Sequence, residues 1–290
     1  MSALIERLDA SFTGPLVSDM PRIYWVDPIE APGSLLLIDP MHPSKPWPAG
    51  VPPTGSFVPN LVWESAAKLT GATEETLQAR YFNTFSAPTR GKAERTSKGA
   101  LHGIVSPTAA LTVNETVMLK VPDMIKNYWK ANPTNEMYLS LWQKVTRVDV
   151  SGQVHVVSLI STNSVFGIGA SAVDFMGGTK INQSSVGGWN VLGNALRSGS
   201  AKPGPNFATD TDTNLNANAL AWNTGMRSSA ANNTGFGSRI IYRMYLEDLT
   251  KSGRSYATVH ALDNALYQKD LVAPGGRYYG DTHTDPTTVP

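Results

Sequence analysis

The acidic residues that best match a metal-binding pattern lie between residues 210 and 216. Asp210, Asp212 and Asn214 alternate with other residues, as the oxygen ligands in the first half of a calcium loop do. The segment lacks the glycine at the sixth position of such a loop, and its twelfth residue is Ala221 instead of a bidentate glutamate. Two interpretations stay open: a calcium site at Asp210, Asp212 and Asn214, or a turn rich in Asp and Asn.

Two tryptophan–asparagine pairs have the composition of a sugar-binding site. Trp189 and Asn190 form one pair, and Trp222 and Asn223 form the other. An indole ring can stack on a sugar while the neighbouring amide orients the sugar hydroxyls. The same residues also suit buried anchors of loops, so ligand binding and anchoring are both kept as hypotheses.

No set of residues has the spacing of a catalytic site. Residues 167–172 imitate a dinucleotide fingerprint, but glycines follow and the matching position offers no acid. Glu247 and Asp248 are adjacent, so a strand directs them to opposite faces, which does not suit the paired carboxylates of a glycosidase. The five histidines lack the spacing of zinc ligands. The sequence therefore predicts no enzymatic activity and no cofactor, with calcium as the one ion that it could hold.

The composition favours strands and turns over long helices. Hydrophobic residues make up 41% of the 290 residues, whereas charged residues make up 16%, against about 25% in an average globular domain. Ser, Thr, Asn, Gly and Pro take their place, and these residues compete with helical hydrogen bonding or break it. The length suits one large sandwich or two small domains.

The charge pattern argues against a nucleic-acid partner. The net charge is +1, and the densest basic stretch, 90–98, is interrupted by Glu94 and is interpreted as a solvated loop. There are no cysteines, which excludes disulfides and thiolate metal sites. The N-terminus lacks a signal-peptide pattern and no apolar run reaches about eighteen residues, so we expect a protein made in a cytoplasm that does not enter a membrane.

Residues 1–32 are predicted to form an extended N-terminal arm. The arm begins with a short amphipathic pattern at residues 4–8, and four later prolines prevent a long helix. The apolar side chains of Tyr24, Trp25 and Val26 need a covering surface, which we expect a neighbouring subunit to provide. The arm is therefore interpreted as an assembly element.

The residues that follow carry strand patterns separated by long loops. Strands are predicted at 33–40, 116–121 and 136–142, and a hairpin is predicted at 145–160, where Ser151-Gly152 joins its two strands. The other segments are a stiff proline-rich loop at 40–59, a partly helical stretch at 61–82, a polar loop at 86–100, a helical turn at 125–128 and long loops over about 161–238.

The clearest strand pattern of the chain begins at Ser238. Polar and apolar side chains alternate from there to Leu249, which predicts one buried face, with Arg243 and Glu247 on the opposite face. The side chains predicted to face the core are those of Ile240, Tyr242, Met244 and Leu246.

A short helix is predicted after this strand. Ser252-Gly253 ends the strand, Ser255 can cap the helix, and apolar residues recur at helical spacing from Val259 to Leu266. Residues 281–290 are polar and end in proline, and we expect a mobile tail there.

The first and last elements together resemble a known architecture. The strand that opens at Gly33, the Asn60-Leu-Val-Trp63 segment, and the closing strand and helix after Ser238 resemble the start and the end of a laminin-G-like (concanavalin-A-like) jelly roll. With its N-terminal arm, the whole chain is similar to structural proteins of tailed bacteriophage particles. The resemblance covers about residues 33–280.

The resemblance implies an all-β fold: a jelly-roll β-sandwich with a C-terminal helix and an extended N-terminal arm. It implies a non-enzymatic virion protein of a tail, baseplate or head decoration, which binds other virion proteins and itself as a homo-oligomer, with a trimer as the guess. Calcium also occurs in laminin-G-like domains. The alternative is a carbohydrate- or receptor-binding protein at the particle surface. The sequence does not specify the position in the particle, the copy number or a host ligand.

Overall fold

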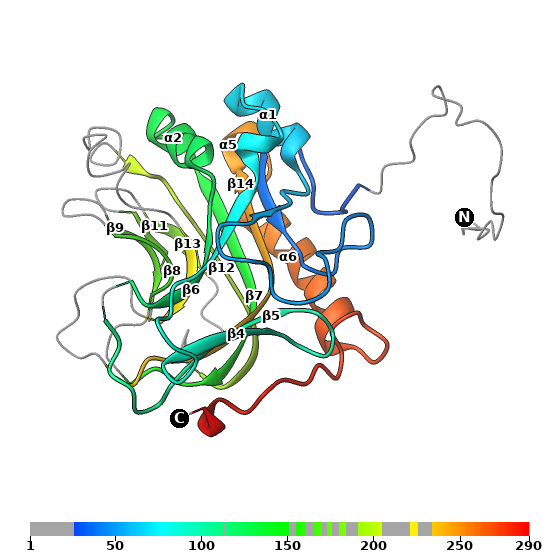
Figure 1. Ribbon diagram of the computed structural model, residues 1–290. Coiled ribbons are helices and arrows are strands. Elements are labelled where there is room, and N and C mark those ends of the chain that lie inside the picture. The colour runs from blue at the N-terminus through cyan, green and yellow to red at the C-terminus, as the bar shows by residue number, and fades with distance from the viewer. Residues whose placement is uncertain are drawn as a thin grey trace, which may run out of the picture.

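The chain folds mainly into β-strands arranged in two sheets. The computed structural model describes residues 26–112, 114–150, 155–160, 165–169, 173–175, 180–183, 191–204, 221–225 and 234–289. Every strand pairing within these ranges is antiparallel, and each sheet has seven strands. The two sheets form the β-sandwich that the sequence predicted (Figure 1).

Sheet A contains the two longest strands, β7 and β14, at its centre. In spatial order its strands are β11 (Lys180–Gln183), β12 (Gly193–Ala201), β7 (Met137–Arg147), β14 (Ser238–Asp248), β5 (Leu101–Val105) and β4 (Gly91–Arg95), and β1 (Ser34–Ile38) also pairs with β14. Sheet B has the order β10 (Val173–Phe175), β9 (Val165–Gly169), β8 (His155–Ile160), β13 (Ala221–Gly225), β6 (Thr116–Lys120), β3 (Ala79–Asn83) and β2 (Phe57–Val58).

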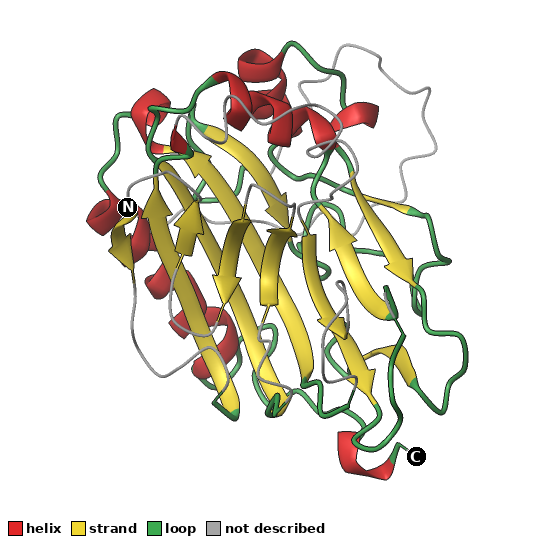
Figure 2. Cartoon of the chain, turned by 90° about the vertical axis from the view of Figure 1, so that its left-hand side faces the viewer, coloured by secondary structure: helices red, strands yellow, loops and turns green. Residues whose placement is uncertain are grey.

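The helices lie outside the two sheets, and Figure 2 shows them gathered at one end of the strands and behind them. The α-helices are α1 (Trp63–Thr70), α2 (Asp123–Ala131), α5 (Leu249–Ser252) and α6 (Tyr256–Tyr267). A π-helical turn, Gln268–Val272, continues α6, and 3-10 turns lie at Glu75–Leu77 and Pro286–Thr288.

The apolar core lies between the sheets. Leu141 and Met244 of sheet A and Leu119 and Trp222 of sheet B are fully buried in one cluster. Burying one such aliphatic side chain contributes about 1.5–3 kcal/mol. The sheets approach closely at Gly103, where an added Cβ atom would stand 2.0 Å from the Thr224 methyl group. Glycine is therefore required at this point of β5.

The free edge of β1 is closed by one side chain. Asn60 accepts a hydrogen bond from Leu37 N at 3.0 Å and donates one to Leu35 O at 2.9 Å. Leu61 N adds a third bond, to Leu37 O. The amide of Asn60 thus satisfies the edge groups that would otherwise pair with another strand.

The closing strand β14 is confirmed, but its alternation is broken. The register shifts between Ile241 and Arg243, and residues on either side of this β-bulge switch faces. Ile241 and Met244 both lie in the core between the sheets, whereas Tyr242 packs in a separate cluster on the other face. The prediction that Ile240, Tyr242, Met244 and Leu246 share one face is therefore wrong.

The predicted hairpin around Ser151-Gly152 is also wrong. β7 pairs with β12 along one edge and with β14 along the other, so neither edge is open to the strand that follows. β8 instead pairs with β9 and β13 in the opposite sheet. The chain crosses between sheets here, and a local turn signal does not distinguish such a crossing from a hairpin.

Three other local predictions were right in part. The helical stretch within 61–82 is α1, but Glu75–Leu77 forms only a 3-10 turn and Tyr81 lies in strand β3. The expected polar loop at 86–100 contains strand β4, and the helical turn at 125–128 is the nine-residue α2. Tertiary contacts override local propensity in these segments.

The C-terminal helix follows its predicted signals. The strand ends at Asp248 and not at the predicted Ser252-Gly253, because Leu249–Ser252 forms the short helix α5, which ends at the left-handed Gly253. Ser255 caps α6 as predicted, by accepting a hydrogen bond from Thr258 N. Val259 of α6 is buried against sheet A. The caps and the apolar spacing were sufficient to place this helix.

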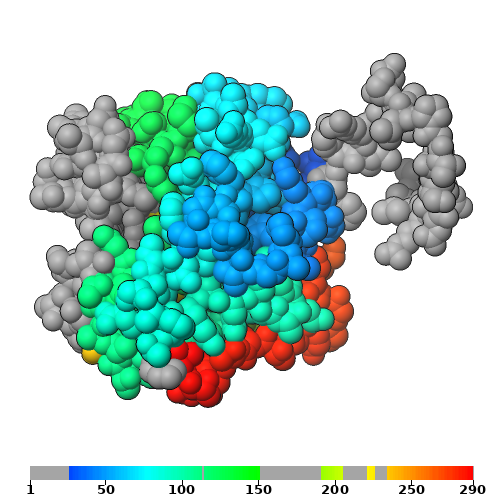
Figure 3. Space-filling model, viewed as in Figure 1, coloured from blue at the N-terminus to red at the C-terminus, as the bar shows by residue number. Residues whose placement is uncertain are grey.

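The C-terminal residues 281–289 pack against sheet A and are not a mobile tail. Thr284 donates two hydrogen bonds to the carboxylate of Glu94 in β4, at 2.8 and 2.5 Å. Ser97 N bonds to Thr282 O, and Val289 is buried. Figure 3 shows these residues, in red, along the base of the molecule. We name residues 281–289 the C-terminal strap.

Candidate functional site

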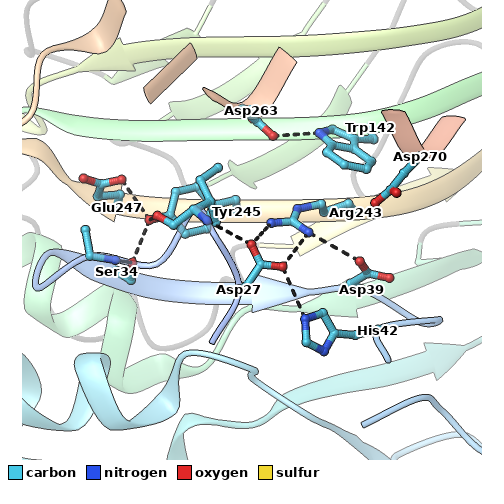
Figure 4. A network of polar contacts seen from close by, with 12 residues as sticks. Asp27, Ser34, Asp39, His42, Trp142, Arg243, Tyr245, Glu247, Asp263 and Asp270 are labelled. Carbon is cyan, nitrogen blue, oxygen red and sulfur yellow. Dashed lines mark hydrogen bonds and ion pairs between the residues drawn. The ribbon is translucent and has the colours of Figure 1, made fainter. Parts of the chain in front are cut away.

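Charged side chains gather on the outward face of sheet A, the face turned away from sheet B (Figure 4). Arg243 of β14 is only 1% exposed. Its terminal nitrogens bind both oxygens of Asp27, with Nη1–Oδ2 and Nη2–Oδ1 distances of 2.9 and 2.7 Å. Nη1 also lies 3.4 Å from Asp39 Oδ2. One arginine therefore joins β14 to the segments on both sides of β1.

A second arginine attaches the segment that follows α6. Arg277 binds Asp270 Oδ2 through Nε at 3.0 Å and Nη2 at 2.6 Å, and Nη2 also binds Asp39 Oδ2 at 2.9 Å. Tyr278 donates its hydroxyl proton to the other oxygen of Asp39, at 2.8 Å. We name the linked residues Asp27, Asp39, Arg243, Asp270, Arg277 and Tyr278 the ionic cluster.

The ionic cluster holds Asp27 and Arg243 in their charged forms. Burial alone would raise the pKa of Asp27, but hydrogen bonds from His42 and Arg243 and the charge of Arg243 hold this pKa well below its usual value. Burial would likewise lower the pKa of Arg243, but the carboxylates of Asp27 and Asp39 raise it. The Asp27–Arg243 pair therefore stays ionised at any physiological pH.

Another buried carboxylate fixes α6 on the same face. Asp263 accepts hydrogen bonds from Trp142 Nε1 at 2.8 Å and from the Tyr138 hydroxyl at 3.0 Å. Burial raises the pKa of Asp263, against the lowering effect of the nearby Arg243 charge. The Arg243 guanidinium lies over the Trp142 ring, 4.9 Å from its centroid. α6 is thus tied to both central strands, β7 and β14.

A pocket of about 490 Å³ borders the ionic cluster. Asp27, His42, Arg243, Asp270 and Arg277 contribute its polar wall. Its remaining lining is formed by Pro28, Pro43, Leu266, Lys269, Ala273, Pro274, Gly275 and Gly276. The volume is that of a small-molecule site, but most of the charged groups in its wall already bind one another.

Ser44, His42 and Asp27 have the order of a catalytic Ser-His-Asp relay. His42 Nδ1 lies 2.7 Å from Ser44 Oγ, and His42 Nε2 lies 3.3 Å from Asp27 Oδ2. In a hydrolase the aspartate must be available to stabilise the imidazolium. Here Arg243 binds both oxygens of Asp27, and Ser44 N also donates to His42 Nδ1, as in a local turn. The geometry favours a structural turn over an activated nucleophile.

The carboxylates of the ionic cluster do not form an acid–base pair. Asp27 and Asp39 contact the same Nη1 atom of Arg243, and the charge of Arg243 helps to hold the pKa of Asp27 below its usual value. A glycosidase needs one of its two carboxyl groups to stay protonated. In the part of the chain that the structure describes, no three His, Asp or Glu side chains are arranged to hold a metal ion. What the ionic cluster can do is hold distant chain segments together.

The structure describes only some of the residues that the sequence singled out. Trp222 and Asn223 lie in β13 and are buried, Trp222 within the core between the sheets. This position agrees with the anchor hypothesis and leaves Trp222 no face on which a sugar could stack. The residues Trp189, Asn190, Asp210, Asp212 and Asn214 lie outside the described residues.

The predicted boundary at residue 33, between an N-terminal arm and the folded body, differs from the observed one. Tyr24 and Trp25 lie outside the described residues, and Val26 is 63% exposed. From Asp27 onward the chain packs on the sandwich, because Asp27 binds Arg243 and Ile29 is fully buried. The folded body therefore begins at residue 27 instead of residue 33.

Comparisons with known proteins found no protein similar to this chain. A scan against protein-family models gave no match, and neither the curated proteins nor the solved structures contained a similar chain. No helix of the described ranges is both long and apolar enough to span a membrane. The fold and the site together define a two-sheet antiparallel β-protein with an ion-paired outward face.

The sequence analysis did not find the ionic cluster. Asp27 and Arg243 are 216 positions apart, and Asp39 and Arg277 are 238 apart. The available signal was Arg243, the one charged residue between Ile240 and Leu246. A buried arginine requires a partner, but the pattern gives no indication of which acid it is.

Proposed function

We propose that this protein is a non-enzymatic structural protein of a tailed-phage particle, in its tail, baseplate or head decoration, and that it acts through subunit assembly. The observation that carries this proposal is that every carboxylate of the ionic cluster already binds an arginine. Asp27, Asp39 and Asp270 each bind an arginine, so the charges of the ionic cluster hold segments of the chain together.

The phage assignment and the jelly-roll topology rest on the resemblance of the opening strand, the closing strand and the C-terminal helix. Those elements are present at 34–38, 238–248 and 256–267. Val26, which precedes the folded sandwich, is exposed. The residues before it are therefore in a position to contact a neighbouring subunit. Tyr24, Trp25 and Val26 would form the first contact, within a homo-oligomer for which a trimer is the proposed state.

Mass spectrometry of purified particles tests this proposal. In the phage and host from which the gene derives, we expect peptides of this chain in gradient-purified particles, at a fixed ratio to the other virion proteins. The chain should also release no reducing ends from capsular or lipopolysaccharide glycans. Its absence from particles, or glycan turnover abolished by mutation of a single acid, would overturn the proposal.

A carbohydrate- or receptor-binding role is the second candidate, and the pocket beside the ionic cluster is the observation that favours it. Lys269 is exposed at this pocket, next to Asp270 and Arg277, and such mixed charges can bind sugar hydroxyls. A glycan array separates the two candidates. Binding that Lys269→Ala weakens supports the receptor role, whereas an array without signal supports the purely structural role.

The calcium hypothesis is tested separately by thermal unfolding with and without EDTA. An ion that binds only the native state stabilises it by about 2.7 kcal/mol at a hundredfold excess over its Kd. If Asp210, Asp212 and Asn214 form only a turn, chelation leaves the melting temperature unchanged. A decrease of several degrees that Asp210→Asn abolishes would assign an ion to this segment.

A further inference from the structure

An apolar groove runs between α6 and β12, on the outward face of sheet A. It has a volume of about 440 Å³, and we name it the α6–β12 groove. Val191, Leu192 and Val272 line it and are 52%, 62% and 44% exposed. These are three of the seven large hydrophobic residues that are exposed in the described chain. Apolar side chains gathered at one groove mark an interaction surface.

The polar lining of the α6–β12 groove favours an acidic occupant. Arg197 and His260 are its two basic residues, and no carboxylate lines it. His260 is held in place, with Nδ1 2.8 Å from Ser198 Oγ and its ring stacked on Tyr256. The remaining polar lining consists of the amides of Asn194, Asn264 and Gln268 and the hydroxyl of Tyr267. A segment with both apolar and acidic side chains would match this surface.

The N-terminal residues of the chain have this composition. Leu4, Ile5 and Leu8 would lie on one face of a helix, and the charged residues among them are Glu6, Arg7 and Asp9, with acids in excess. Apolar side chains at this spacing are typical of a helix that binds in a groove.

The position of Val26 makes this occupant reachable. Asp27 and Pro28 line the pocket on one side of the α6 helix and its π-helical extension, and the α6–β12 groove lies on the other side. The 25 preceding residues can span up to about 80 Å when extended, at roughly 3.3 Å per residue. They can therefore reach the groove of an adjacent copy.

We propose that residues 2–9 of one copy bind as an amphipathic helix in the α6–β12 groove of a neighbouring copy. The inference rests on the proposed function, since it names the surface through which the subunits assemble. Binding of this kind is head-to-tail, because the segment and the groove are different surfaces, and it closes into a ring when the rotation permits.

Cysteine cross-linking tests this docking directly, because the chain has no cysteine of its own. A protein carrying Leu4→Cys is mixed with one carrying Val272→Cys and treated with a short bis-maleimide. We expect a cross-linked species of twice the chain mass that contains both variants. The matched control replaces Val272→Cys with Phe57→Cys, an exposed position in sheet B, and should give little mixed product.

Three results would overturn the docking. One is equal yields with the two partner variants, and another is no mixed product at all. The third is intrachain cross-linking of the double variant Leu4→Cys/Val272→Cys at the expense of the mixed product, which would assign the groove to the chain's own segment. Loss of the mixed product on adding Leu192→Glu to the groove copy, with circular dichroism unchanged, supports the proposal.

This experiment uses purified protein and is independent of particle assembly. A chain that enters particles without giving the mixed product contradicts the docking and leaves the proposed function intact. A chain that gives the mixed product but never enters particles supports the docking and contradicts the phage assignment.

Discussion

The two faces of β14 are both buried, but they are buried by different chemistry. Ile241, Met244 and Leu246 turn toward sheet B and pack in an apolar core. Arg243 on the opposite face binds carboxylates from segments far away in sequence. Glu247 on the same face accepts hydrogen bonds from Arg254, in the turn before α6. Apolar contacts are non-directional, whereas an arginine fork fits one carboxylate geometry. The inward face thus supplies stability, and the outward face determines which segments pack there.

The largest effect should come from removing one charge of the ionic cluster. Arg243→Met would leave Asp27 buried without its arginine, whereas Asp39 keeps Arg277, and breaking a buried pair in this way costs about 3–5 kcal/mol. Urea denaturation should show this decrease in the free energy of unfolding.

Two control variants sharpen this test. Lys45→Met removes the exposed Lys45–Glu74 pair, whose side chains are half exposed, and should cost about 0.2–1 kcal/mol. Adding Asp27→Leu to Arg243→Met should recover part of the loss, because apolar replacements of a buried pair are often tolerated. A loss of under 1 kcal/mol for Arg243→Met would contradict the difference between the faces.

A similar or slightly smaller loss should follow truncation on the inward face. Leu246 is fully buried in the core between the sheets, and a buried Leu→Ala change costs about 2–5 kcal/mol through lost transfer energy and the cavity left behind. Because no charge is involved, this loss should be the same at pH 7 and pH 5. Unfolding curves at both pH values measure it, and a marked pH dependence of the Leu246→Ala effect would be the contrary result.

On the outward face, in contrast, the packing of the C-terminal strap should weaken in acid. Burial would raise the pKa of Glu94, but hydrogen bonds from His102 and Thr284 lower it to about 2. Burial also lowers the pKa of His102, against the opposing effect of Glu94, and burial, Lys144 and His102 lower the pKa of His283. In all three cases the unfolded or released form binds protons more readily than the packed form.

The stabilisation of the C-terminal strap is therefore complete above about pH 6.5. It declines as pH falls, first because the two histidines take up protons and then, below about pH 4.5, because Glu94 does. Hydrogen exchange at Thr284 N should accelerate, relative to an unstructured peptide, between pH 7 and pH 4. Glu94→Gln should give weaker protection at pH 7. Equal protection at both pH values in the unmodified chain would show that these contacts do not hold the C-terminal strap.

The elements that local sequence patterns predicted are those whose signals lie close together in the chain. Ser255 marked the start of α6, and strand alternation located β6, β7 and β14. The bulge at Tyr242 and the crossing between β7 and β8 were missed, because each depends on which distant strands pair.

The candidate site could not be predicted for the same reason. The ionic cluster combines Asp27, Asp39, Arg243, Asp270 and Arg277, none of which forms a recognisable spacing with the others. The C-terminal strap was expected to be mobile because it is polar, yet its Thr and Asp side chains are what bind it to Glu94 and Ser97. A polar composition does not distinguish a solvated segment from one whose partners are polar.

The central claim is that Asp27 joins the N-terminal segment to β14 through Arg243. Two truncated chains test it, one beginning at Val26 and one beginning at Pro28, which differ by the loss of Asp27 and one exposed residue. Losing the carboxylate leaves Arg243 with Asp39 as its one remaining carboxylate partner within the ionic cluster. The shorter chain should be less stable by about 3 kcal/mol, which lowers Tm by roughly 6–10 °C for a chain of this size. Equal melting temperatures of the two chains would contradict the claim.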